Sequence, residues 1–188
     1  MLIATALTTD LELPMSVETA SVPLPSATLD AAPSTAAIAG HPIHPMLVPL
    51  PIGMIASAAI SDLVAMNGGG SFWARASRLL LGGGLATGAM AGVFGAIDFV
   101  TIQQARRPEG WIHLGGNAAV LGLTAANLAV RGDRSRVPFL GALLTVSAAS
   151  LLLITGWMGG ELSYRHRVGV TDRRHGEITG SNAELAEV

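Results

Sequence analysis

The chain has 188 residues, of which 50% are hydrophobic and only 13% are charged, and its formal net charge is -2. Soluble domains carry about 25% charged residues, so this composition predicts a membrane protein. Cysteine is absent, which excludes disulfides, thiolate metal ligands and a cysteine nucleophile. All 11 basic residues are arginine and they form no basic run, so the sequence gives no case for a nucleic-acid partner.

The first 39 residues are rich in Ala, Thr, Ser and Pro, contain no basic residue and show no helical or strand periodicity. This composition is typical of a disordered tail. The tail lacks the positive n-region of a secretory signal and the arginines of a transit peptide, so we expect the first apolar span to direct membrane insertion. Residues 171–188 are predicted to form a second, polar tail.

Residues 40–170 are predicted to form one all-α domain, an integral membrane four-helix up-and-down bundle. Because a helix rises about 1.5 Å per residue, roughly 20 apolar residues cross the hydrocarbon core of a bilayer. The apolar stretches of this length are residues 45–66, 79–100, 111–130 and 137–158. An even number of spans places both termini on the same side, in a bacterial inner membrane. The arginines are distributed too evenly over the two sides to orient the protein.

The second predicted span carries Gly84, Gly88 and Gly92 at intervals of four residues. Small residues at this spacing let a neighbouring helix approach closely. The pattern leaves open whether that helix belongs to the same chain or to a second copy in a homo-oligomer. The first two spans do not resemble the last two, so the sequence shows no sign of the internal repeats on which many transporters are built.

Polar residues near the span ends gather on one face of the membrane. Helices that alternate in direction bring the start of each odd span and the end of each even span to the same face. The residues placed there are His41 and His44 before the first span, Asp98 at the end of the second, His113 at the start of the third, and Glu161, Tyr164 and His166 after the fourth. Asn117 follows one helical turn after the third-span histidine.

Ionisable residues within apolar sequence are costly and usually face a partner. We therefore predict that the Asp98 carboxylate pairs with the His113 imidazole and orients it. His41 and His44 each precede a proline, which favours extended backbone and argues against a helical pair of ligands. The prolines instead form a stiff approach that holds His44 over the mouth of the bundle.

Asp62 is a separate case, because it lies near the far end of the first span, close to the arginine-rich opposite face. The first and third loops supply these arginines. We expect a salt bridge from Asp62 to Arg75, to Arg78 or to an arginine of the third loop, rather than a proton relay.

The histidines on the shared face suggest a metal or redox site. Two of His44, His113 and His166 could ligate the iron of haem b. Alternatively, histidines together with Asp98 or Glu161 could hold iron, zinc or copper. Neither site has diagnostic spacing, since the chain contains no CxxCH and no HExxH. Binding of a quinone is a third reading, and a structural or protein-interaction module without a cofactor is the alternative. Whether the protein is an enzyme stays open.

The segments GHPIHPMLVPLPIG and GGELSYRHRVGV resemble the two end signatures of the bacterial membrane family called domain of unknown function 2231. The resemblance covers residues 40–170 and implies four membrane helices. Some relatives look fused to Rieske or cytochrome-type electron-transfer domains, which implies a redox role with a quinone or an electron-transfer protein as partner. Arg167 stands where the second signature is expected to have glycine. The residues that the resemblance carries over are His41, His44, His113, Glu161, Tyr164 and His166.

Overall fold

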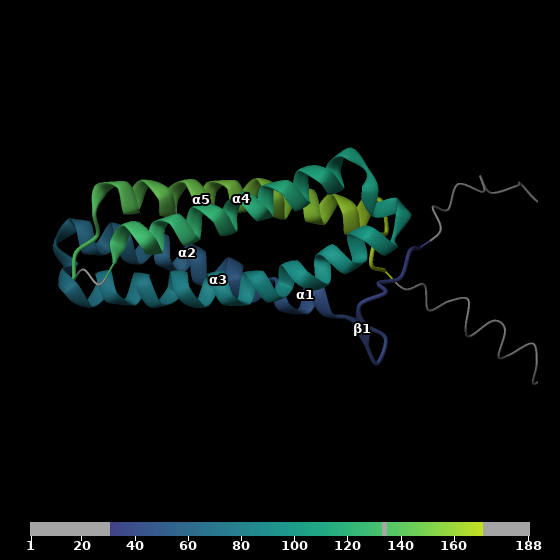
Figure 1. The fold of residues 1–188 in the computed structure, drawn as a ribbon, viewed down its shortest axis with the longest axis horizontal. Coiled ribbons are helices and arrows are strands. Elements are labelled where there is room, and N and C mark those ends of the chain that lie inside the picture. The colour runs from purple at the N-terminus through teal and green to yellow at the C-terminus, as the bar shows by residue number, and fades with distance from the viewer. Residues whose placement is uncertain (1–30, 133–134, 171–188) are drawn as a thin grey trace, which may run out of the picture.

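The first half of the described chain is one continuous helical stretch that folds back on itself. A computed structural model describes residues 31–132 and 135–170, which are mostly helical (Figure 1). Most of the two predicted tails, residues 1–30 and 171–188, lies outside the described residues. The stretch consists of α1 (Ile43–Leu47), α2 (Pro49–Val64), the turn η1 (Ala65–Gly69) and the long helix α3 (Gly70–Thr101).

The second half consists of two further helices, each extended by a short turn. The 3-10 turn η2 (Gln103–Arg106) leads into α4 (Pro108–Arg131), whose first residue is a proline. Proline suits this position because the first amides of a helix have no partner within it. After residues 135–138 the chain continues as α5 (Phe139–Gly160), and η3 (Glu161–Arg165) prolongs this helix.

Helices α2 and α3 form one antiparallel hairpin, and α4 and α5 form a second that packs beside it (Figure 1). The chain reverses between α2 and α3 at Gly68 and Gly70, whose φ angles of 95° and 78° favour glycine. The glycines complete the reversal within a few residues. Helix α3 therefore begins at Gly70, and residues 71–78, predicted as an interfacial connection, are helical.

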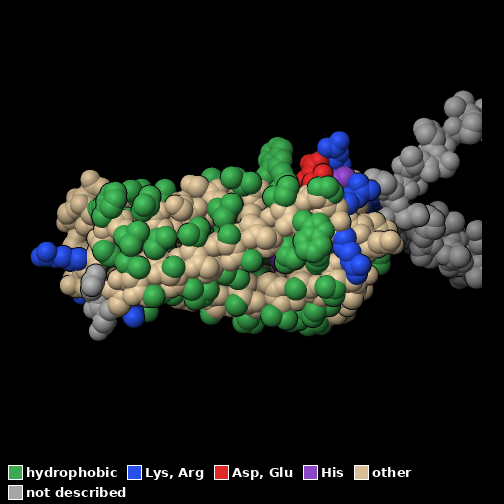
Figure 2. Space-filling view, turned by 45° about the horizontal axis from the view of Figure 1, so that its top comes forward, with side chains coloured by type: hydrophobic (Ala, Val, Ile, Leu, Met, Phe, Trp, Pro, Cys, Tyr) green, Lys and Arg blue, Asp and Glu red, His purple; other side chains and the backbone are tan. Residues whose placement is uncertain are grey.

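Large apolar side chains cover the outside of the hairpins, over almost the whole length of the molecule (Figure 2). Leu79, Phe139 and Leu153 are 74%, 76% and 79% exposed. A water-soluble protein buries such side chains, because their transfer from water stabilises the fold. An outer surface of this kind is that of a helical protein surrounded by lipid.

The inside of the hairpins is filled mainly by Ala, Gly, Ser and Thr, with one small aliphatic cluster of Ile55, Val120 and Ala148. Small residues at helix contacts are typical of membrane proteins, in which close backbone approach replaces the hydrophobic effect. By length and composition, the helical stretches Ile43–Thr101 and Phe139–Arg165 can each cross a membrane.

Residues 31–42 cross the end of the hairpins before α1 begins. The N–H of Ala32 donates to the backbone oxygen of Arg167 (3.2 Å), and the N–H of Gly169 donates to the oxygen of Ala32 (2.7 Å). Strands β1 (Ala37–Ile38) and β2 (His41–Pro42) then form a small antiparallel hairpin. The expectation of disorder up to residue 39 is therefore wrong for residues 31–39, because backbone groups from distant segments bind them.

Candidate functional site

His44 lies in α1, and its imidazole packs against α3. Its Nδ1 atom lies 2.8 Å from the backbone oxygen of Ala91. A Cβ atom on Gly95, one turn further along α3, would lie 2.8 Å from the same nitrogen. The missing side chain of Gly95 thus leaves the space that the imidazole fills, while the Ala91 carbonyl fixes the orientation of the ring.

His113 lies in α4 and makes the corresponding contacts with α5. Its Nδ1 atom lies 2.8 Å from the backbone oxygen of Thr155. A Cβ atom on Gly159 would lie 2.9 Å from its Cε1 atom. The Asn117 amide donates to the backbone oxygen of His113 (2.8 Å), and the Thr155 hydroxyl donates to the Asn117 side-chain oxygen (3.3 Å). A carbonyl and a glycine therefore hold this second imidazole too.

The two imidazoles lie close together, with ring centroids 6.1 Å apart and planes at 90°. A carbonyl oxygen can only accept a hydrogen bond, so Nδ1 of each ring carries the proton and Nε2 keeps its lone pair. Within residues 31–132 and 135–170, Nε2 of His44 has no hydrogen-bond partner, and Nε2 of His113 has only a long contact of 3.4 Å from the Asn117 amide. Two lone pairs are thus free for a ligand.

The two histidines occupy equivalent positions because the second hairpin repeats the first. His44 and His113 are 69 residues apart, and so are Asp62 and Arg131. Other buried positions of α2 and α4 follow the same offset: Pro51 and Val120, Ile55 and Thr124, Ala58 and Asn127. Helices α2 and α4 therefore run in the same direction and present the same face to the interior.

Helices α3 and α5 correspond in the same way, with an offset of 64 residues. Ala91 matches Thr155, and Gly95 matches Gly159. The expectation that the first two spans do not resemble the last two is therefore wrong at the level of buried register. Few residues are identical, so the repeat hardly shows in the sequence. Its visible traces are an Ile-His dipeptide before each offset of 18 residues to Asp62 or Arg131, and a Gly-x-x-Gly ending at each packing glycine.

The other two histidine candidates do not join the pair. His41 lies in β2 at the surface, with Nδ1 3.0 Å from the backbone oxygen of Ala39. His166 follows η3, and its Nδ1 atom is buried with no hydrogen-bond partner among the described residues. No group of three or more His, Cys, Asp or Glu side chains in the described part of the chain could hold a metal ion. The structure brings together His44 and His113 alone.

The remaining acidic and aromatic candidates of the C-terminal signature face outward. Glu161 forms an ion pair with Arg165 (2.6 Å) one helical turn away, and the Arg165 side chain is 75% exposed. Tyr164 is 91% exposed. Exposed pairs of this kind contribute little to stability. These residues lie at the surface of the molecule and make no printed contact with either imidazole of the pair.

The glycines of α3 differ in what they contact. A Cβ atom on Gly84 would lie 2.9 Å from the Ile55 side chain of α2, and one on Gly88 would lie 2.8 Å from the Leu121 side chain of α4. Both contacts are within the chain. Gly92 faces open space, with nothing within 4 Å of the position of a Cβ atom. Glycine spacing by itself did not distinguish the packed positions from the open one.

Asp98 does not pair with His113, contrary to the prediction. Its carboxylate accepts hydrogen bonds from the Ser34 hydroxyl (2.7 Å), the Thr35 N–H (2.9 Å) and the Ala36 N–H (3.1 Å). The prediction failed because it treated residues 31–39 as disordered and therefore unable to supply donors. His113 instead uses a backbone carbonyl of its own hairpin.

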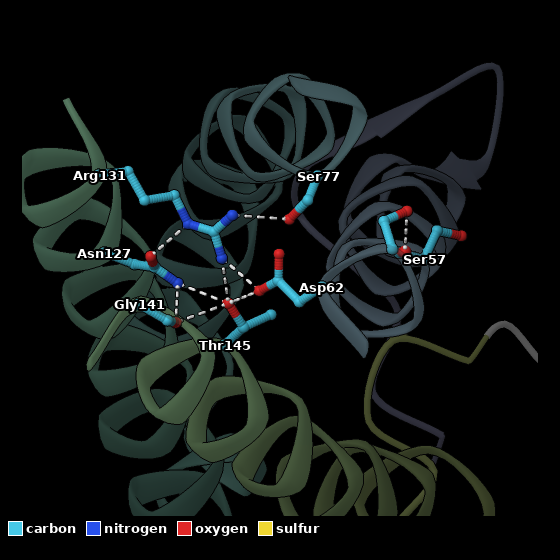
Figure 3. Close-up of polar contacts among 8 residues, drawn as sticks. Ser57, Asp62, Ser77, Asn127, Arg131, Gly141 and Thr145 are labelled. Atoms are coloured by element: carbon cyan, nitrogen blue, oxygen red, sulfur yellow. Dashed lines mark hydrogen bonds and ion pairs between the residues drawn. The ribbon is translucent and has the colours of Figure 1, made fainter. Parts of the chain in front are cut away.

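A buried polar network lies at the opposite end of the hairpins (Figure 3). Arg131 forms an ion pair with Asp62, and the two side chains are only 3% and 1% exposed. This confirms the expected salt bridge, although Arg131 is the last residue of α4 rather than part of a loop. Arg131 also donates to Asn127 (2.7 Å), to Ser77 (3.1 Å) and to Thr145 (3.0 Å). The network therefore draws on α2, α3, α4 and α5.

The fold and the surface define the class: a helical membrane protein with a polar interior. The chain belongs to the family described as predicted membrane protein (DUF2231), whose model matches residues 40–172. The match includes both signature segments, so the resemblance is confirmed. No curated protein and no solved structure shows significant similarity to the chain.

Proposed function

We propose that this protein is an inner-membrane four-helix bundle that binds a redox cofactor between its two hairpins through His44 and His113. The observation that carries the proposal is the paired geometry of the two imidazoles. Each ring has Nδ1 fixed by a backbone carbonyl and packs against a glycine, and the ring centroids are 6.1 Å apart. Histidines that bind metals are usually oriented in this way by a hydrogen bond from the other ring nitrogen.

The spacing of the rings fits a shared metal centre. Two imidazoles that bind one metal through Nε2 at about 2.0 Å place their ring centroids about 6 Å apart. A structural zinc site needs four protein ligands, and the described residues offer no group of three or more candidate ligands. Haem iron needs only two axial ligands from the protein, because the porphyrin supplies the other four. Haem b therefore suits this donor set better than a zinc ion.

His44 and His113 would hold the iron of haem b, which supplies one-electron transfer when bound. Both histidines lie near the ends of their helices, so the cofactor would be close to one surface of the membrane. A quinone in the bilayer or an electron-transfer protein at that surface is the partner that this position favours. The outward-facing side chains of Glu161 and Tyr164 lie at the same end of the chain's helices and would meet such a partner.

The experiment is an absorption spectrum of the purified protein in mild detergent, oxidised and dithionite-reduced, with haem added to the colourless protein by titration. We expect sharp Soret and α bands typical of two axial histidines. His44→Ala and His113→Ala should each abolish these bands. His41→Ala and His166→Ala are matched controls, because neither histidine belongs to the pair, and they should leave the spectrum unchanged.

Metal analysis of the same samples separates the two kinds of centre. Copper in place of haem, lost in the same two variants, would keep the histidine pair as the site and change the cofactor. A protein that takes up neither haem nor metal on titration would overturn the proposal.

The alternative is a structural or protein-interaction module, and one observation favours it: each imidazole fills the space beside a glycine and so contributes to packing. In that case His113→Phe, which keeps a ring of similar width, should leave assembly intact, while Gly88→Leu, which collides with Leu121, should disrupt it. Under the cofactor proposal, His113→Phe instead abolishes the spectrum of a protein that remains folded.

A further inference from the structure

The two imidazoles are equivalent in the repeat, but the chain holds them in different ways. His113 lies five residues inside α4, a helix of 24 residues, so the helix itself fixes its backbone. His44 lies in α1, a helix of only 5 residues that follows an irregular segment. A helix of five residues is too short to be stable by itself. The position of His44 therefore depends on what holds the segment before it.

That segment is fixed to α3 through Asp98. The carboxylate accepts four hydrogen bonds from Ser34 and Thr35 and one from the N–H of Ala36 (3.1 Å). Asp98 lies in the last turn of α3, where the helix dipole disfavours a negative charge. The helix gains nothing from an aspartate there, whereas the segment gains an acceptor for donors that would otherwise lack a partner.

A short hydrogen-bonded path connects Asp98 to His44. The backbone oxygen of Ala36 accepts from the N–H of Ile43 (2.9 Å), and between these residues the chain forms the hairpin of β1 and β2. His44 is the next residue, and its ring returns to α3 at Ala91. Helix α3 thus grips the segment at two places, by the Asp98 carboxylate and by the carbonyl that receives the imidazole.

The second hairpin has no such clamp. The position equivalent to Asp98, 64 residues later, is Leu162, an apolar residue that is 8% exposed. The acid is present only in the hairpin whose histidine lacks a long helix. We propose that Asp98 is a positioning residue for His44, and that its carboxylate sets this imidazole opposite His113 by clamping residues 34–36. The inference rests on the proposed function only for its spectroscopic readout.

The test is Asp98→Ala, with Thr101→Val as the matched control. Thr101 lies on the same turn of α3 and contacts only the Thr35 hydroxyl of the segment, at 2.5 Å. In the haem-loaded protein, Asp98→Ala should convert the spectrum to that of a single axial histidine, the state expected if His44 alone is displaced. Asp98→Glu should restore part of the two-histidine spectrum. Thr101→Val should keep it.

A second measurement does not depend on a cofactor. Because the chain has no cysteine, spin labels can be attached at Ala37→Cys in β1 and Val93→Cys on the outside of α3. The distance distribution between them should be narrow in the parent protein and should broaden at least twofold with Asp98→Ala. An unchanged distribution and an unchanged spectrum would overturn the inference. A broadened distribution in a protein that binds no cofactor would sustain the clamp and reject the proposed function.

Discussion

The two ends of the repeated hairpins carry equivalent positions with opposite chemistry. At one end, which we call the histidine end, the repeat places two identical side chains, His44 and His113, opposite each other. At the other, the arginine end, it places Asp62 opposite Arg131. Identical donors suit a ligand shared between the hairpins. Opposite charges satisfy each other and need no ligand.

The difference indicates a division of tasks within one architecture. The ion pair is buried and hydrogen-bonded to all four long helices of the described chain, so it locks the hairpins together. It also makes the hairpins non-interchangeable, because a copy of either would place like charges opposite each other. The histidine end keeps its lone pairs free, at the cost of no bond between the hairpins there.

The largest effect is expected from breaking the arginine end. Arg131→Ala leaves the Asp62 carboxylate buried without its partner, which should cost about 3 to 5 kcal/mol of unfolding free energy. Thermal unfolding in detergent, followed by circular dichroism, measures it. Replacing both residues by leucine removes both charges and should recover most of the loss. A single variant as stable as the parent would contradict the assignment of the lock to this pair.

An intermediate effect is expected from the glycines of the histidine end. Gly95→Ala places a Cβ atom 2.8 Å from Nδ1 of His44, so the ring must move, at a cost of about 1 to 3 kcal/mol. Gly159→Ala should act alike on His113. Gly92→Ala is the control on the same helix, since nothing lies within 4 Å of its added atom. Unfolding curves and haem titration should show a loss for the first two variants and none for the control.

The smallest effect is expected at Arg167, beside the segment that closes the histidine end. Arg167 has φ 53°, in the left-handed region that favours glycine. This geometry explains why the family signature is expected to have glycine there. Arg167→Gly and Arg167→Ala both remove the side chain, so their comparison isolates the backbone. The glycine variant should be more stable by about 1 kcal/mol, and equal unfolding midpoints would contradict this account.

The residues of the candidate site were named by the sequence, but their partners were not. Counting apolar spans placed His44, His113 and Asp98 on one face, since the direction of a helix follows from its order in the chain. Which of them touch depends on rotation and register. The sequence paired Asp98 with His113 by proximity in the apolar pattern, whereas the carboxylate binds residues 34–36 instead.

The repeat escaped the sequence for a related reason. Lipid requires only that the outside be apolar and the inside small, so many residues satisfy each position. Ala91 and Thr155, or Ile55 and Thr124, fill equivalent places without similarity. Equivalence becomes visible only when the buried positions of the two hairpins are aligned.

The sequence by itself determined the class of this protein. Composition, the lengths of the apolar stretches and the two signature segments are local properties, and they established a helical membrane protein of its family. The tertiary structure decided the contacts: Asp62 with Arg131, 69 residues apart, and each histidine with a carbonyl 47 or 42 residues away. Such partners meet only when packing has fixed the register of the helices, and no local pattern of residues encodes that register.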